Sequence, residues 1–407
     1  MSRFVNLFSE IGKLNTVMLH RPGIEVEQLI PEYLERMLSE DTPHVPTAAK
    51  EHDYFADVIR KSGANVLYLR DLFLDVIKIE QAKHEFIEDY LIVGEAQSEY
   101  LKQAIREYLL SKTDEEFFEC IMRGIRKKDI EVKPSSCLAL VIQDDYPFFI
   151  DPVSSLYFTR DISICIGNGM IVSSMSMPFR KREPLLMRYI YKYHPFFRED
   201  DTPLWYDYNL GYSVEGGDLL VLSDKVIAVG YSQRTSIGAI ENIANNILRN
   251  GYEKILVFNL PKIRRFMHLD VLCTMIDHDK FIVSPHVAKG DFDMYEITLQ
   301  KSGLLRASLV TKSMRDAFKR ALGLRAIDFI QVGGDDYIDS TREHWNMGSN
   351  SLTVAPGEII TYSRNDITNS LLVKHGIKLH TIPDSELSRG RGGPRCMSMP
   401  INRDNLK

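Results

Sequence analysis

The chain has 407 residues, of which 44% are hydrophobic and 26% are charged, a composition typical of a folded protein with one large or two ordinary domains. Its formal net charge is −6, from 50 Lys and Arg against 56 Asp and Glu, which argues against nucleic acid or an anionic membrane as a partner. The sequence has no apolar run as long as a membrane span and no signal-peptide pattern at its polar N-terminus, so we expect a cytoplasmic protein.

The first elements along the chain are a predicted strand, a helix and a second strand. Residues 13–20 alternate weakly in polarity and end in an Arg-Pro-Gly turn, which indicates a strand. Residues 47–62 have apolar positions at helical spacing, with Thr47 as the candidate N-cap. Residues 65–69 then suit a short strand.

A long stretch without proline follows. From about residue 71 to residue 130 the apolar side chains keep helical spacing, as in Leu101 and Ile105. We therefore expect a helical insertion over 71–130 within a mixed α/β domain made of residues 1–70 and 131–407.

From residue 134 onward short strands and turns dominate, and one unit of strand, arginine-containing turn and helix recurs. The three copies are 170–175 with Arg180 and 183–193, 226–231 with Arg234 and 237–248, and 358–362 with Arg364 and 367–374. Most α/β folds repeat this rhythm, so the recurrence alone indicates only a repeated α/β unit.

Five cysteines are spread along the chain without a CxxC pair, which predicts reduced thiols and no zinc ribbon. Four of them have apolar neighbours and are expected to be small buried side chains: Cys120, Cys137, Cys165 and Cys273.

Cys396 has different neighbours. Three arginines and three glycines lie within the seven residues before it. Nearby cations stabilise a thiolate, and glycines allow the backbone to approach a ligand closely, so this segment predicts a reactive cysteine. The alternative is a solvated basic loop with an incidental cysteine.

Three other stretches hold candidate acids and a candidate base. They are Phe158-Thr159-Arg160-Asp161, Glu215-Gly216-Gly217-Asp218 and Phe266-Met267-His268-Leu269-Asp270. If the last is a strand, His268 and Asp270 lie on the same face. Taken singly, each stretch is more often an ordinary turn or ion pair.

Together, a thiol, a histidine and three carboxylates suit chemistry on a guanidinium group. This planar cation requires fork-shaped carboxylate partners in a dry site. Its carbon is a poor electrophile, so a thiolate and an acid for the departing ammonia are both useful. The chain has no P-loop, HExxH, GxSxG or dinucleotide fingerprint.

The sequence closely resembles bacterial arginine deiminases, a family of the pentein superfamily, nearly end to end. The matching stretches are Ser9 to Leu14, Lys50-Glu51-His52, Phe158 to Asp161, Ile166 to Gly169, Glu215 to Asp218, Ser232 to Thr235, Phe266 to Asp270, Tyr362 to Asn365 and Arg389 to Pro400. The last of these, with Cys396-Met397-Ser398-Met399-Pro400, is highly specific.

This resemblance implies a five-fold pseudosymmetric α/β propeller (pentein) with an inserted helical bundle. It also implies the first step of arginine catabolism, hydrolysis of L-arginine to L-citrulline and ammonia through a covalent thiouronium intermediate. The implied catalytic residues are Cys396 as nucleophile, His268 as acid and then base, and Glu215, Asp161 and Asp270 as the guanidinium clamp. The residues implied to bind the remainder of the substrate are Arg180, Arg234, Arg391, Gly390 and Phe158. The resemblance implies no cofactor and no metal, and a homo-oligomer.

The chain departs from the family pattern at several positions. Ser154-Ser155 replaces Pro-Asn, Ile162 replaces a proline, Leu38-Ser39-Glu40-Asp41 replaces a more apolar pattern, and Met347 replaces an aspartate.

Two alternatives stay open. The first is another pentein enzyme, such as agmatine deiminase or a dimethylarginine hydrolase. Agmatine has no carboxylate, so the three arginines for a substrate carboxylate disfavour it, and the helical insertion and the Gly-Arg-Gly-Gly loop also favour arginine deiminase. The second is a divergent, inactive paralogue with a binding role, which the retained nucleophile, histidine and carboxylates disfavour.

Overall fold

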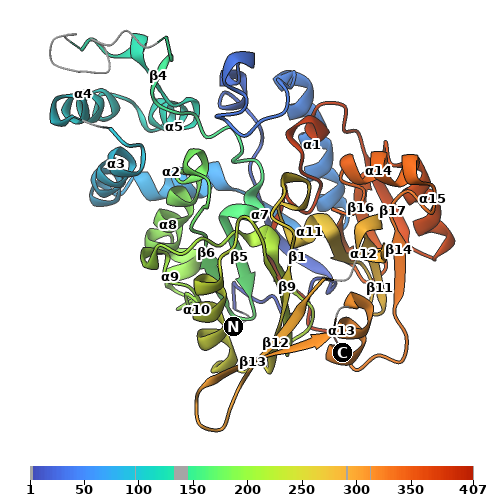
Figure 1. Ribbon diagram of the computed structural model, residues 1–407. Helices are drawn as coiled ribbons and strands as arrows, with labels where there is room; N and C mark the ends of the chain where they lie inside the picture. The colour runs from blue at the N-terminus through green and yellow to red at the C-terminus, as the bar shows by residue number, and fades with distance from the viewer. Residues whose placement is uncertain (1–2, 97, 133–144, 290–291, 312, 407) are drawn as a thin grey trace.

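The computed structural model describes residues 3–96, 98–132, 145–289, 292–311 and 313–406 (Figure 1). Its strands are β1 (Leu14–Leu19), β2 (Asn65–Tyr68), β3 (Ile125–Arg126), β4 (Phe148–Ile150), β5 (Ser163–Ile166), β6 (Gly169–Val172), β7 (Leu219–Val221), β8 (Val226–Tyr231), β9 (Lys254–Asn259), β10 (Cys273–Met275), β11 (Lys280–Val283), β12 (Met294–Leu299), β13 (Leu305–Thr311), β14 (Asp328–Gln331), β15 (Leu352–Ala355), β16 (Glu358–Tyr362), β17 (Lys378–Ile382) and β18 (Met399–Arg403). Its α-helices are α1 (Val45–Lys61), α2 (Leu69–Ile77), α3 (Glu80–Val93), α4 (Glu99–Leu110), α5 (Asp114–Arg123), α7 (Thr159–Ile162), α8 (Glu183–Tyr193), α9 (Pro195–Arg198), α10 (Ile237–Leu248), α11 (Leu269–Leu272), α12 (Pro285–Lys289), α13 (Met314–Ala321), α14 (Tyr337–Trp345) and α15 (Asp366–Lys374).

One strand arrangement recurs in four sheets of the described chain. A central strand pairs antiparallel with one neighbour and parallel with the other. The parallel neighbour comes later in the sequence, after a helix or a longer connection. The central strands are β1, β8, β11 and β16. The pair β5 and β6 follows the same pattern in reduced form, because Met170 of β6 makes a parallel bridge with Leu204. The mixed α/β class and the repeated unit predicted from the sequence are therefore confirmed.

The helices α2 to α5 fill most of the stretch predicted to be a helical insertion, and α2 and α3 contact α8. The first of them begins at Leu69, earlier than predicted. The last ends before Gly124, which has φ +75° and lies so close to the Ile150 carbonyl that a Cβ there would be 2.5 Å from it. The chain then forms β3, which pairs with β4, so the last helix of this stretch ends at Arg123, a few residues before the expected limit of about 130.

Two other local predictions need correction. Helix α1 begins at Val45 and its N-cap is His44, not Thr47, because Pro46 fits the first turn, where no backbone donor is needed. The residues around His268 form no strand: His268 is the N-cap residue of the single-turn helix α11, which carries Asp270.

The two ends of the chain meet in one sheet. Strand β18 pairs antiparallel with β1, and the Arg403 N–H donates to the Asn6 carbonyl at 2.8 Å. Ile401 of β18 is fully buried in the main hydrophobic core. This pairing places the segment that ends in Cys396 against the N-terminal residues. Among the described residues, none of the helices combines the length and apolarity that crossing a bilayer requires.

Candidate active site

The predicted catalytic residues share one position in the fold, just ahead of the strand that starts each sheet unit. Asp161 lies on α7 before β5, Glu215 precedes β7, Asp270 lies on α11 before β10, and Cys396 precedes β18. Asn350 holds the equivalent place before β15. Short helices and turns therefore aim five polar side chains from separate sheets at one region.

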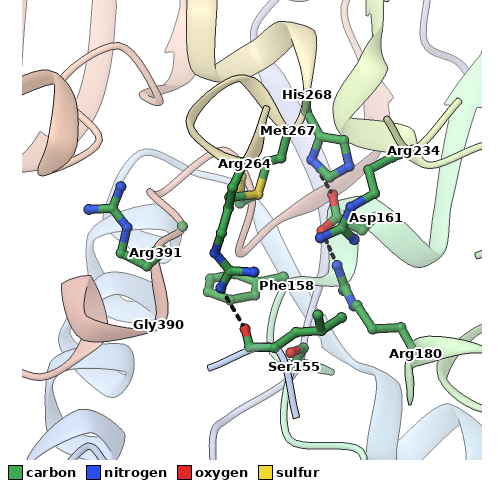
Figure 2. A pocket seen from close by; sticks show the side chains of 13 residues that line it. Ser155, Phe158, Asp161, Arg180, Arg234, Arg264, Met267, His268, Gly390 and Arg391 are labelled. Atoms are coloured by element: carbon green, nitrogen blue, oxygen red, sulfur yellow. Dashed lines mark hydrogen bonds and ion pairs between the residues drawn. The ribbon is translucent and has the colours of Figure 1, made fainter. Parts of the chain in front are cut away.

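His268 lies between two of these carboxylates. Its Nε2 is 2.8 Å from Glu215 Oε2. Its Nδ1 is 3.5 Å from Asp161 Oδ1, a contact drawn in Figure 2. All three side chains are buried. Burial alone would lower the pKa of His268, but Asp161 and Glu215 outweigh it and raise the pKa to about 9. The imidazole is therefore protonated at neutral pH and can donate a proton.

Close backbone packing fixes this arrangement. Glu215 is followed by the short 3₁₀ turn Gly216–Asp218. A Cβ on Gly217 would lie 2.5 Å from His268 Nδ1 and 3.0 Å from Asp161 Oδ1. The Glu-Gly-Gly-Asp pattern thus has a steric reason, because only glycine lets the turn pack against the imidazole.

Cys396 lies beside Asp270. Its Sγ is 3.5 Å from Asp270 Oδ2, and its backbone N–H donates to Asn350 Oδ1 at 3.0 Å. Burial raises the pKa of the Cys396 thiol well above its usual range, and Asp270 and Asp161 raise it further, while Arg395 opposes them. The arginines of the loop therefore do not offset the effects of burial and of the two carboxylates on this thiol.

The positions of the loop arginines explain this result. Arg389 pairs with Asp41 and Glu386 on the surface. Arg391 stacks on the Trp345 ring, 3.3 Å from its centroid, and donates to the Trp345 carbonyl. Figure 2 shows the Arg391 side chain across the pocket from Asp161 and His268. Arg395 instead donates to Asp270, the carboxylate that lies beside the Cys396 sulfur.

The other two arginines predicted to bind substrate lie at the carboxylates. Arg180 donates to Asp161 Oδ2 at 2.8 Å and to Glu183 at 2.8–3.1 Å. Arg234 Nη1 is 3.3 Å from Glu215 Oε2. The structure thus brings Arg180 and Arg234 together with the predicted clamp and leaves Arg391 at the pocket wall.

A cavity of about 30 Å³ lies at the centre of these groups, with room for one or two water molecules. All but two of the predicted site residues line it, the exceptions being Glu215 and Asp270. Its lining residues are Leu38, Ser155, Phe158, Asp161, Arg180, Arg234, Arg264, Met267, His268, Gly390, Arg391, Gly392 and Cys396. Leu38 covers it, with its carbonyl accepting from Arg264 Nη2 at 3.0 Å.

Several residues of this region were missed by sequence reasoning. Glu183 holds Arg180, Asn350 holds the Cys396 backbone, and Glu10 and Arg395 are fully buried partners of each other. Only Glu10 and Arg395 lay in stretches that the family resemblance singled out. Asn350 had one signal, its place before a strand that starts a repeated unit.

Asp161, Glu215 and His268 also have ligand atoms within 4.8 Å of one another, a spacing compatible with a metal ion. Arg180 and Arg234 already pair with the two carboxylates, and the raised pKa of His268 keeps a proton on the imidazole. A metal ligand has to lose that proton. The donor set therefore favours an organic cation over a metal ion.

Solved structures of two other proteins have a similar fold. An amidinotransferase from Microseira wollei in the saxitoxin biosynthetic pathway matches with a TM-score of 0.56 and 14% identity, over 99% of this chain and 98% of that one. DDAH from Pseudomonas aeruginosa, in complex with citrulline, matches with a TM-score of 0.54 and 11% identity, over 95% and 99%. At these identities the similarity is one of fold.

The chain belongs to the arginine deiminase family, whose sequence model matches residues 35–403. It is 44% identical to the arginine deiminase of Bacillus cereus strain ATCC 10987 over 412 residues, covering all of both chains. It is also 44% identical to the arginine deiminase of Streptococcus agalactiae serotype V, over 99% of this chain and 98% of that one.

Proposed function

We propose that the protein hydrolyses L-arginine to L-citrulline and ammonia, with Cys396 as the nucleophile. One observation carries this proposal beyond family membership. Asp161 and Asp270 each have one oxygen held by a buried arginine, at 2.8 Å and 2.9 Å. The other oxygen of each, Oδ1, is buried and accepts no hydrogen bond from any described residue. Two such oxygens are suited to the N–H groups of a guanidinium ion.

In the proposed reaction, substrate binding converts the protonated Cys396 thiol into the reactive thiolate. Asp270 and Asp161 are among the causes that raise the pKa of Cys396. A guanidinium cation held by these carboxylates would offset their charge and lower that pKa, so the thiol loses its proton as arginine enters. The resting thiol is thereby protected from unproductive reactions until substrate is present.

The covalent steps follow from the positions of Cys396 and His268. The thiolate attacks the guanidinium carbon, and the resulting tetrahedral adduct expels one nitrogen as ammonia after His268 donates its proton. The product is a thiouronium bonded to Cys396. The neutral imidazole then takes a proton from water, whose oxygen attacks the same carbon. The C–S bond then breaks with its electron pair on the sulfur, which takes up the hydroxyl proton of the adduct. Neutral citrulline leaves, and the Cys396 thiol is restored.

The amino-acid end of the substrate is assigned to Arg180, Arg234 and Arg391, with Gly390 and the Phe158 ring beside them. The present cavity is smaller than arginine. We infer that Arg180 and Arg234 exchange part of their pairing with Asp161 and Glu215 for the substrate carboxylate, and that Arg391 leaves Trp345. Agmatine, which has no carboxylate, would gain nothing from these arginines.

The finer architecture is also a proposal. Four complete sheet units and the reduced unit of β5 and β6 support a five-fold pseudosymmetric α/β propeller. We propose residues 1–70 and 131–407 as its catalytic domain and 71–130 as an inserted helical bundle, supported by α2 to α5. A cytoplasmic homo-oligomer that uses no cofactor is proposed by family resemblance.

The direct test is to incubate the purified protein with L-arginine and measure citrulline and ammonia, with agmatine in parallel. We expect equimolar products from arginine and little from agmatine. Cys396→Ala should be inactive, whereas Cys165→Ala, a matched change at another buried cysteine, should keep its activity. Agmatine preferred over arginine would identify another guanidino hydrolase, and an inert wild type would indicate an inactive paralogue.

A further inference from the structure

We propose that Glu10 and Arg395 form a buried relay that positions Asp270 and sets how readily the Cys396 thiol ionises. The proposal rests on the function proposed above, in which Asp270 binds the guanidinium and Cys396 attacks it. Glu10 and Arg395 are therefore positioning residues. They lie behind Asp270 and Cys396, the groups that touch the substrate.

The contacts run in one line from the N-terminal segment to the nucleophile. Glu10 Oε2 accepts from Arg395 Nε at 3.2 Å, and Glu10 Oε1 accepts from Arg395 Nη2 at 3.1 Å. Arg395 Nη1 donates to Asp270 Oδ2 at 2.9 Å, the oxygen that lies 3.5 Å from Cys396 Sγ. Such a two-pronged carboxylate contact fixes the guanidinium plane.

This geometry determines which oxygen of Asp270 faces the substrate. With Oδ2 held by Arg395, the other oxygen is the one without a hydrogen-bond partner among the described residues. Arg395 is further held by the Leu219 carbonyl at 2.8 Å, and Glu10 by the Val221 N–H at 3.1 Å. Both anchors lie on β7, so the relay is built into the fold.

The charges of the surrounding cluster show why Glu10 is needed. Three arginines (160, 395 and 403) and two carboxylates (Glu10 and Asp270) form a group that is at most 5% exposed at any side chain. The cluster thus carries one excess positive charge while Cys396 is a thiol, and a thiolate balances it. Without Glu10 the excess would double.

Other charged or titratable groups face the two ends of the relay. Around Cys396 they are Asp270 on α11, Asp161 on α7, the neighbouring Arg395, and Tyr157 and Tyr362; around Glu10 they are Arg395, Arg160 and Arg403. Burial acts to raise the pKa of Glu10, but these arginines outweigh it and lower the pKa to about 2. Glu10 therefore carries its charge throughout the pH range of a thiol titration.

These charges determine the direction in which loss of Glu10 shifts the ionisation of Cys396. Loss of the Glu10 charge leaves Arg395 less neutralised, which stabilises the Cys396 thiolate and weakens the net negative charge that Asp270 offers to the guanidinium. In Glu10→Gln we therefore expect thiolate formation at a pH lower by about one unit, as for removal of a buried charge at an effective dielectric constant of about 20. The KM for arginine should rise several-fold, with a smaller change in kcat.

The test follows thiolate absorbance in the ultraviolet against pH, in the wild type and in Glu10→Gln. Each protein is referenced to its own Cys396→Ala version, so that tyrosine ionisation cancels. Glu343→Gln is the matched control, because Glu343 is a buried carboxylate that caps α15 away from the cavity. It can lose stability, but its thiolate curve should match the wild type.

Thiolate formation in Glu10→Gln at the same or a higher pH than in the wild type would overturn the relay. Glu10→Asp keeps the charge on a side chain too short for the same contact with Arg395, so its curve should shift in the same direction, measurably but less than half as far. If Glu10→Gln does not fold, Glu10→Asp decides, because a curve identical to the wild type would contradict the proposal. The absorbance needs no turnover, so a failed relay and a failed arginine hydrolysis are distinguishable.

Discussion

Two residues of the site hold their protons more tightly than they do in water. His268 holds its proton because of Asp161 and Glu215, and Cys396 holds its proton because of burial beside Asp270. In the resting site the proposed acid, His268, is protonated, and the proposed nucleophile, Cys396, is not yet ionised. This combination fits a reaction in which the substrate cation itself triggers attack.

The fall of kcat/KM at high pH tests the protonation state of His268. Its pKa is raised to about 9, so the protonated acid persists below that pH and is lost as the pH rises through it. Since kcat/KM reports groups of the free enzyme, we expect it to fall above about pH 9. A fall centred near the ordinary histidine value of about 6.5 would contradict the assignment.

Ser155 lines the cavity where the family pattern has asparagine. A serine hydroxyl is shorter and offers fewer hydrogen bonds than an amide. We expect Ser155→Asn to lower the KM for arginine several-fold, equivalent to about 1 kcal/mol, with nearly unchanged kcat. Steady-state kinetics with agmatine in parallel provide the control, since agmatine should gain little. An unchanged KM for arginine would show that the serine is neutral.

At the scale of elements, the site depends on tight turns rather than on long helices or strands. The turn Gly216–Asp218 packs against His268, and a Cβ on Gly217 would overlap the imidazole. Gly217→Ala should displace His268 and lower kcat by about 10²-fold, the typical effect of an ångström-scale misplacement. Kinetics beside Gly23→Ala, whose Cβ would have the Glu25 carboxylate at 3.3 Å as its nearest contact, isolate the effect. Wild-type turnover in Gly217→Ala would show that His268 is not held by this turn.

Some secondary-structure elements could be predicted from the sequence with their observed bounds, and others could not. The helices 183–193 and 237–248 and the strands 226–231 and 358–362 were predicted with their observed bounds, because their apolar periodicity is strong and tertiary packing agrees with it. The turn of α11 was not predicted, and the segment was considered only as a possible strand, because five residues cannot show a helical period. The expectation for Cys137 lies outside the described residues.

The site residues were predictable as a set, but their electrostatics were not. The family resemblance supplied Cys396, His268 and the carboxylates. The number of arginines in the loop suggested a thiolate, yet only the fold shows that Arg391 turns to Trp345 and that Arg395 is shared with Glu10. Which charges face one another depends on contacts between residues hundreds of positions apart.

At the scale of the whole molecule, the chain closes on itself through β1 and β18. The nucleophile lies just before β18, so the stability of this sheet supports the position of Cys396. Ile401→Ala would open a cavity in the main core and should lower the free energy of unfolding by about 2–5 kcal/mol. Urea unfolding would measure it, with Leu304→Ala, which is 67% exposed, as the matched control. A loss below about 0.5 kcal/mol, no more than a surface change, would contradict the packing described for this sheet.

The central claim, that Cys396 forms a covalent bond to the carbon of arginine, can be tested on the molecule itself. His268→Ala lacks the residue that activates water, and acid quenching during its reaction with L-arginine should preserve any thiouronium for mass spectrometry of the peptides. We predict that the Cys396 peptide gains the mass of arginine less ammonia, in His268→Ala or transiently in the wild type. Citrulline formation by a wild type that never shows this mass on Cys396, or that shows it on another cysteine, would contradict the account.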